Sequence, residues 1–382
     1  MSPRRAPHRV ALTGARAEPG ASQADRPAGA FPRASLLMLL APVAWVAGQS
    51  GASLVAFPAS VLALVGGALV LGEAAEVVAQ RAGQGVGALL TATLSNLIDL
   101  AILGAALSAG LYDVVQAGIT GAIVGNVLFA LGGAMFLGGL RRPKQLFPRE
   151  AANTNTTLLL LASFAIVAPT VAAAVVGARN PGVGARLTMP IAVVLFITYV
   201  GAMVFSLRTH RDLFNPEGHE EDDGLAVHPA IARHPYALLG ASVAFVAWMA
   251  EVLAGNIEPV GAQLSLSPLF LGIVVIGVVT NAVEITICWR MAMRDRLHVA
   301  IQAAVGGSIQ VVLFVVPVLV FVSQFFTHGP FSLELPLDMT ASILMTAILI
   351  NVIAADGEST WYEGAMMLAL WTIIAMVFYV HT

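Results

Sequence analysis

Charged residues are scarce in this chain of 382 residues, in which Asp, Glu, Lys and Arg together make up 11% of the sequence. Hydrophobic residues make up 58%, and the mean hydropathy is +0.84. Both values lie far outside the range of soluble globular domains. The apolar runs are about 20 residues long, the length that an α-helix needs to cross the hydrocarbon core. The sequence therefore predicts an integral membrane protein made of helices and surrounded by a lipid bilayer.

Several chemical signatures are also missing. Cys288 is the only cysteine, which excludes an intrachain disulfide. The sequence contains no HExxH, GxSxG or P-loop pattern and no histidine cluster, so it offers little support for an intramembrane enzyme. No histidine lies near the middle of an apolar run, which disfavours a zinc site. The net charge of −3 gives no indication of a nucleic-acid partner.

The apolar runs predict eleven membrane spans. We expect them near 36–50, 54–79, 85–109, 114–138, 156–177, 187–207, 235–254, 267–289, 297–322, 338–355 and 360–380. Short cytoplasmic loops retain Lys and Arg, which tests this assignment. Seventeen of the nineteen basic residues fall in the N-terminal segment and in alternate loops, and only Arg179 and Arg186 fall on the other side. The expected N-terminus is therefore cytoplasmic and the expected C-terminus lies outside.

The domain organisation follows from these spans. Residues 1–34 are expected to be a disordered basic cytoplasmic tail, or to result from an upstream start codon, and 35–51 an extra N-terminal transmembrane helix. Residues 52–207 and 235–382 would then hold five spans each. The hydrophilic segment 208–234 between them is rich in acids at 217–223 and is either a solvated linker or a regulatory, cation-attracting element. We expect an all-α polytopic membrane protein with about 11 transmembrane helices, in two inverted-topology five-helix repeats plus the extra helix, because an odd number of spans reverses the second copy.

An amide and an acid stand three residues apart inside one apolar run, and the pattern occurs twice. Asn96 and Asp99 in TLSNLID are matched by Asn281 and Glu284 in VTNAVE, each 185 residues further on. Residues three apart share one face of a helix. One face of each span can therefore present both groups to the interface between the repeats.

A second pair of acids precedes the first in each half. Glu76 stands in AEVVA at 75–79, and Glu251 stands in AEVLA at 250–254. A carboxylate at the bilayer centre costs roughly 2.5–3.5 kcal/mol even on the lenient insertion scales, so it needs a partner, a proton or a cation. No basic residue falls deep enough in a span to pair with these four acids. The counter-charge must come from solution, and for two facing carboxylates it can be one divalent cation or two protons.

Oxygen-only ligands suit a hard cation such as calcium, which accepts six to eight of them. Other small or polar residues flank the pairs, and we regard five as supporting residues, with either hydrogen-bonding or ion-contact roles: Thr91, Ser95, Asn126, Ser308 and Gln310. They also allow close packing and local unwinding of helices, which frees carbonyl groups for ions.

With these residues placed, the chain resembles the cation/proton exchanger family, the calcium/proton antiporters of the calcium/cation antiporter superfamily. The resemblance covers nearly all of the membrane part. It is carried in order by GEAAE at 72–76, VGALLTAT at 86–93, FLGGLRR at 136–142, EPV at 258–260, NAVE at 281–284, GGSIQ at 306–310 and DGESTWYEG at 356–364.

The resemblance implies a role for each matching residue. Asp99 and Glu284 would bind the cation with nearby carbonyl groups, Asn96 and Asn281 would lie in the same motifs, and Glu76 and Glu251 would serve proton transfer or gating. Four positions depart from the family pattern. Asp99 stands where Glu is usual, Thr91 where Asn is usual, Ser95 where Gly is usual and Ile285 where His is usual. These departures bear on cation preference and proton coupling.

The predicted function is therefore a secondary antiporter, not an enzyme, that exchanges cytoplasmic calcium for protons by alternating access and needs no cofactor. The same fold could instead carry sodium, potassium or manganese, and an intramembrane enzyme or a channel is a more distant alternative. We expect the protein in a prokaryotic inner membrane. A homo-oligomer is compatible with this prediction.

Overall fold

A computed structural model of the chain describes residues 31–82, 93–94, 96–204, 231, 233–326 and 328–380. Nearly all of its ordered elements are helices. The first half contains α1 (Phe31–Met38), α2 (Ala41–Gln49), α3 (Ser53–Ala82), α5 (Leu97–Ser108), α6 (Tyr112–Val124), the π-helical segment η2 (Gly125–Leu131), α7 (Gly132–Gly139), β1 (Gln145–Leu146), α8 (Arg149–Val176) and α9 (Val183–Val204). This outcome is what apolar sequences dictate, because a helix satisfies its backbone hydrogen bonds internally where lipid offers none.

The second half repeats the helical pattern. It contains α12 (Pro235–Leu264), α13 (Pro268–Phe270), the π-helical η4 (Leu271–Ile276), α14 (Gly277–Thr280), α15 (Ala282–Met293), α16 (Leu297–Gln310), the π-helical η5 (Val311–Val315), α17 (Val316–Ser323), α18 (Leu337–Ile353), β2 (Glu358–Ser359) and α19 (Trp361–Val380). A π-helical segment is rare and frequently marks a functional site. Three of them occur in the described residues, all in the spans that follow or contain the polar motifs.

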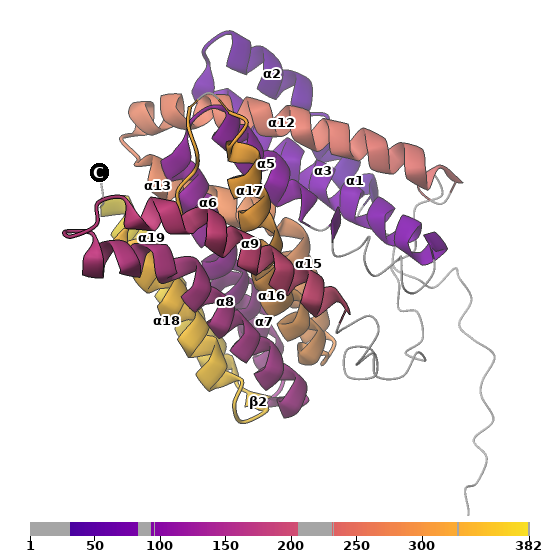
Figure 1. The fold of residues 1–382 in the computed structure, drawn as a ribbon. Coiled ribbons are helices and arrows are strands. Elements are labelled where there is room, and N and C mark those ends of the chain that lie inside the picture. The colour runs from indigo at the N-terminus through magenta and orange to yellow at the C-terminus, as the bar shows by residue number, and fades with distance from the viewer. Residues whose placement is uncertain are drawn as a thin grey trace, which may run out of the picture.

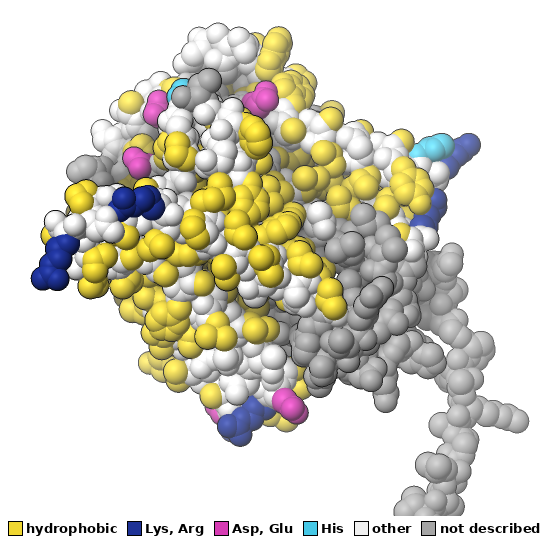
Figure 2. All heavy atoms as spheres, in the orientation of Figure 1, with side chains coloured by type: hydrophobic (Ala, Val, Ile, Leu, Met, Phe, Trp, Pro, Cys, Tyr) yellow, Lys and Arg dark blue, Asp and Glu magenta, His cyan; other side chains and the backbone are white. Residues whose placement is uncertain are grey.

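Helix is present at each of the eleven predicted spans. Among the described residues, seven helices are long and apolar enough to cross a membrane, and one bent pair, Pro268–Thr280 with Ala282–Met293, makes an eighth. Three shorter apolar helices occupy the remaining expected positions: Ser35–Gln49, Leu97–Ser108 and Leu337–Ile353. Figure 2 shows a broad hydrophobic surface, with charged side chains toward the margins of the view. The prediction of an all-helical polytopic membrane protein is confirmed.

Two details differ from the expectation. The first helix begins at Phe31, inside the segment expected to be a tail, and is interrupted before α2 begins at Ala41. The span expected at 267–289 is not one straight helix, because it bends by 60° at Asn281. Residues 1–30, the acidic stretch 217–223, Thr91 and Ser95 lie outside the described part of the chain.

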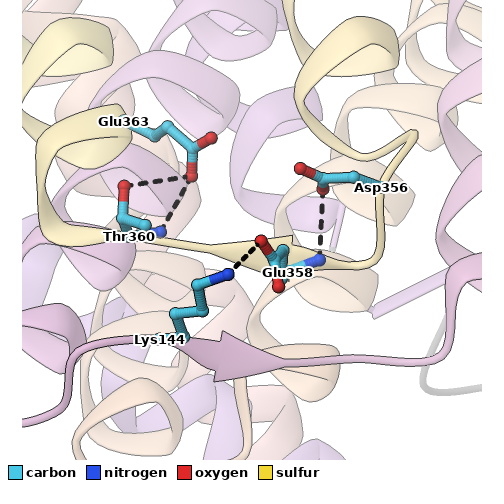
Figure 3. Close-up of polar contacts among 5 residues, drawn as sticks. All are labelled: Lys144, Asp356, Glu358, Thr360 and Glu363. Carbon is cyan, nitrogen blue, oxygen red and sulfur yellow. Dashed lines mark hydrogen bonds and ion pairs between the residues drawn. The ribbon is translucent and has the colours of Figure 1, made fainter.

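Loops from both halves meet at one end of the molecule. Strand β1 pairs antiparallel with β2, with Gln145 opposite Ser359, so the loop after α7 is joined to the loop before α19. Lys144 Nζ lies 2.6 Å from Glu358 Oε1, which raises the pKa of Lys144 above its usual value (Figure 3). Arg142 Nε lies 3.4 Å from Asp295 Oδ2 in the loop between α15 and α16. Exposed ion pairs contribute little, so the β-pairing itself defines this junction.

The opposite end is held by backbone acceptors. Gln116 Nε2, at the start of α6, donates to Ser332 O at 3.0 Å and to Glu334 O at 3.1 Å. Ser267 Oγ, just before α13, donates to Phe378 O near the end of α19 at 3.0 Å. Helix α19 therefore runs from the β-paired end to this opposite end, as the predicted alternation of loops requires.

The continuous segment α6–η2–α7 is the centre of the bundle. Its most apolar 18-residue window is 94% buried inside the protein, more than any other candidate span in the described residues. Helices α3 and α12 pack against each other along one side, while α8, α16 and α18 form the other side (Figure 1). Helices α5, α15, α16, α18 and α19 pack directly against this segment, which itself is shielded from lipid.

Backbone contact joins this central segment to the bent span. A β-carbon on Gly121 would lie 2.5 Å from Ile273 O, and one on Gly277 would lie 2.6 Å from Gly121 C. Small residues allow such approach in membrane bundles. Gly121 and Gly277 therefore set the distance between α6 and the helix break at Asn281.

We expect Gly121→Ala to destabilise the protein by about 1–3 kcal/mol, because the added methyl forces two backbones apart. Gly306 is the matched control, since it lies 185 residues after Gly121 and a β-carbon there would meet nothing within 4 Å. Gly306→Ala should leave the thermal unfolding midpoint in detergent almost unchanged. Equal midpoints for the two variants would contradict the backbone contact.

Candidate cation-binding site

Each of the paired motifs lies at the start of a helix. Asn96 immediately precedes α5 and has φ −86° and ψ 1°, and Asn281 immediately precedes α15 and has φ −94° and ψ 15°. Asp99 and Glu284 therefore lie in the first turn of their helices. The expected single helix face through amide and acid is replaced by a helix start. The first helical turn offers unpaired N–H groups and the positive end of the helix dipole, which favours a carboxylate there.

The break before α15 also exposes backbone acceptors. Helix α14 ends at Thr280, and the last carbonyl groups of a helix have no intrahelical donor. Interrupted helices of this kind form the ion sites of many secondary transporters, because unwound carbonyl groups can coordinate a cation. The bend at Asn281 thus releases carbonyl oxygen atoms that a straight helix would have used internally, and the Asn281 side chain occupies one of them, Gly277 O.

The two carboxylates converge in the interior. Asp99 is 5% exposed, and Glu284 is half-buried with its Oε2 atom buried. They lie close enough for their charges to interact, and the Thr280 side chain lies next to the Asp99 carboxylate. Helices from the two halves of the chain therefore bring their acids to one place.

Four buried oxygen atoms in this region make no hydrogen bond of normal geometry within the described part of the chain, although the Thr280 hydroxyl lies beside the Asp99 carboxylate. They are Asp99 Oδ1, Glu284 Oε2, Asn126 Oδ1 and Thr280 Oγ1. Asn126 in η2 lies near Glu284, the acid carried by α15. A β-carbon on Gly307 would lie 3.0 Å from Asn126 Nδ2 and 3.7 Å from Glu284 Cγ. Buried polar atoms are normally paired, so a group of this size is suited to a bound cation or to ordered water.

The donor set is two carboxylates, one amide oxygen and one hydroxyl. No group of three or more His, Cys, Asp or Glu able to hold a metal occurs in the residues that the structure describes. The remaining ligands must be neutral oxygen atoms from side chains, backbone or water. That composition fits a hard cation and does not fit zinc.

The amide nitrogens of the motifs are already engaged. Asn96 Nδ2 donates to Gln310 Oε1 at 2.6 Å. Asn281 Nδ2 donates to Gly277 O at 2.6 Å and to Ala122 O at 3.2 Å. Ser308 Oγ donates to Ala304 O at 3.0 Å and lies 3.5 Å from Ile123 O, so its hydroxyl serves helix packing.

The structure does not bring Glu76 and Glu251 into this cluster. Both side chains are exposed, Glu76 on α3 and Glu251 on α12. Gln80 Nε2 lies 3.5 Å from Glu76 Oε1, one helical turn away. Their predicted part in proton transfer or gating remains a prediction.

Two residues that were not among the predicted site residues also bear on this site. Thr280 contributes the unpaired hydroxyl described above. Glu73 on α3 is half-buried with its Oε2 atom buried, and its neighbour Gly72 has Val283 3.5 Å from its β-position. The signal for Glu73 was present in GEAAE, where it stands three residues before Glu76, although that motif alone does not say which acid turns inward.

Taken together, an all-helical membrane bundle with a buried oxygen site at interrupted helices defines a secondary cation transporter. The sodium/calcium exchanger protein family matches this chain over residues 52–208 and 234–380, and the chain belongs to that family. It is a transporter and not an enzyme.

Individual relatives support this membership. A Ca(2+)/H(+) antiporter of Synechocystis sp. is 34% identical over 334 residues, which cover 84% of this chain and 89% of that protein. The Ca(2+)/H(+) antiporter ChaA of Bacillus subtilis is 32% identical over 86% of this chain and 92% of its own length. The structure of native YfkE superposes with a TM-score of 0.74 at 28% identity, covering 90% of this chain and 99% of that one. The H+/Ca2+ exchanger CAX has the same fold, with a TM-score of 0.66 at 14% identity over 92% of this chain and 93% of that chain.

Asp99→Asn should abolish stabilisation of the purified protein by calcium. A ligand at one hundred times its Kd stabilises the folded state by about 2.7 kcal/mol, so the wild-type unfolding midpoint should rise with calcium concentration. Without calcium, the variant should be at least as stable as the wild type, because it removes an uncompensated buried charge.

Asp113→Asn is the matched control, since Asp113 is exposed in the first turn of α6. This variant should keep the full calcium-dependent rise. A normal rise in Asp99→Asn would show that the cation binds elsewhere.

Proposed function

We propose that this protein exchanges cytoplasmic calcium for protons across a membrane by alternating access. The observation that carries the proposal is the set of four unpaired buried oxygen atoms, two of them from carboxylates on helices of opposite halves. The relatives from Synechocystis and Bacillus subtilis are Ca(2+)/H(+) antiporters, which supports the same reaction for this chain.

The charge of the site explains how calcium transport would be coupled to proton transport. Two ionised carboxylates repel strongly in a medium of low dielectric. One calcium ion or two protons neutralise them equally well. If only neutral forms of the site pass through the occluded state, neither cation crosses unless the other returns. Asp99 and Glu284 would therefore be shared by both substrates.

The halves of the chain would supply the alternation. We propose that 52–207 and 235–382 are inverted repeats, with 35–51 an extra helix and 208–234 a cytoplasmic linker. Helices α3 and α12 occupy matching positions in the halves and pack against each other. Glu76 and Glu251 on these helices would pass protons between the site and solvent.

The orientation follows from the loops. The end at which β1 pairs with β2 carries Arg141, Arg142, Lys144 and Arg149. Because cytoplasmic loops retain Lys and Arg, we assign this end to the cytoplasm, in a prokaryotic inner membrane. The N-terminus would be cytoplasmic and the C-terminus outside.

Transport into reconstituted vesicles with an imposed pH gradient tests the proposal. Calcium uptake should follow the gradient and fall to background when the gradient is collapsed. Asp99→Asn and Glu284→Gln should each reduce the rate at least a hundredfold, because each leaves one carboxylate and breaks the charge balance.

The same assay should be repeated with manganese, sodium and potassium. Asp99 is one methylene shorter than the Glu that is usual at this position in cation/proton exchangers, which can change the preferred cation. Uptake of another cation in preference to calcium would change the assigned substrate and keep the exchange mechanism. Calcium uptake that is indifferent to the pH gradient would contradict proton coupling.

A further inference from the structure

The two amides that precede the acids are held by different kinds of partner. Asn281 Nδ2 is bound by two backbone carbonyl groups, Gly277 O and Ala122 O. Asn96 Nδ2 is bound by a side chain, Gln310 Oε1, at 2.6 Å. The backbone partners are independent of side-chain identity, whereas the side-chain partner can be lost by a single substitution.

The repeat spacing explains this difference. The residue 185 positions before Gln310 is Gly125. A β-carbon on Gly125 would lie 3.5 Å from Asn281 Nδ2 and 3.3 Å from Gly277 O. Glycine thus leaves room for the Asn281 amide to reach the backbone. In the other half, the equivalent position carries the glutamine that holds Asn96.

The location of Gln310 makes it a suitable orienting group. It is the last residue of α16, directly before the π-helical η5, and it is half-buried. Its carbonyl oxygen accepts from the nitrogen edge of the Asn96 amide. This hydrogen bond fixes the orientation of the Asn96 amide, which stands directly before α5, the helix that carries Asp99 in its first turn.

We propose that Gln310 is a positioning residue that acts on the cation through Asn96, and that it favours calcium over smaller divalent cations. The proposal rests on the proposed function. Calcium takes six to eight oxygen ligands in flexible geometry, whereas a smaller cation is satisfied by fewer. Losing the orientation of the Asn96 amide should therefore weaken the binding of calcium more than the binding of manganese.

A double-mutant cycle on calcium binding to the purified full-length protein tests the positioning role. Gln310→Met keeps the length of the side chain and removes the acceptor. It should raise the half-saturating calcium concentration roughly tenfold, the effect of one hydrogen bond to an ordered ligand group. In an Asn96→Ala background, the same substitution should have little further effect.

The control cycle uses the other half of the site. In an Asn281→Ala background, Gln310→Met should still weaken calcium binding by its full factor, because Asn281 does not contact Gln310. Equal factors in the wild-type and Asn96→Ala backgrounds would overturn the proposal, since Gln310 would then act independently of Asn96.

Selectivity gives a second readout that a general loss of stability does not produce. The ratio of half-saturating calcium to half-saturating manganese should rise in Gln310→Met and in Gln310→Ala, even if either variant yields less folded protein. An unchanged ratio would overturn the assigned selectivity role. Wild-type protein that fails to take up calcium against a pH gradient would instead overturn the proposed function, so the two failures are distinguishable.

Discussion

The repulsion between two buried carboxylates is the constraint on which the rest of the structure depends. Asp99 and Glu284 approach each other in the interior, and neither belongs to an ion pair in the part of the chain that the structure describes. A protein that needed only stability would replace such a pair with apolar side chains. Retaining both charges is useful when their neutralisation by an ion from solution is the event that the protein performs.

The surrounding architecture answers that constraint. Both acids lie in the first turn of a helix, where the dipole reduces the cost of a negative charge. The helix break at Asn281 frees carbonyl groups, and contact between Gly121 and Gly277 brings the central segment against that break. The β-paired loops and the opposite junction at Gln116 hold both ends of the bundle, so the site lies in its interior.

Much of this could be predicted from sequence because membrane helices have simple rules. The eleven spans follow from the length of the apolar runs, and the alternation of basic loops checks their number. The paired Asn and acid motifs were visible because charge inside an apolar run is costly. These features depend on local composition, which a single sequence contains.

Other features depend on tertiary contact and could not be read in this way. At the bend, the Asn281 side chain donates hydrogen bonds to Ala122 O and Gly277 O. The hydrogen bond between Asn96 and Gln310 joins residues 214 positions apart. The exposed positions of Glu76 and Glu251, against the buried Oε2 atom of Glu73, depend on how α3 and α12 rotate against the bundle. Periodicity cannot fix that rotation when a helix is apolar on most of its surface.

The central claim is that one pair of carboxylates holds either calcium or protons. Proton release measured with a pH indicator, when calcium is added to purified protein in weakly buffered detergent solution, tests it most directly. At about pH 6, the wild type should release up to two protons for each calcium bound, and the double variant Asp99→Asn with Glu284→Gln should release none. Calcium binding to the wild type without proton release from about pH 5 to about pH 8 would contradict the account.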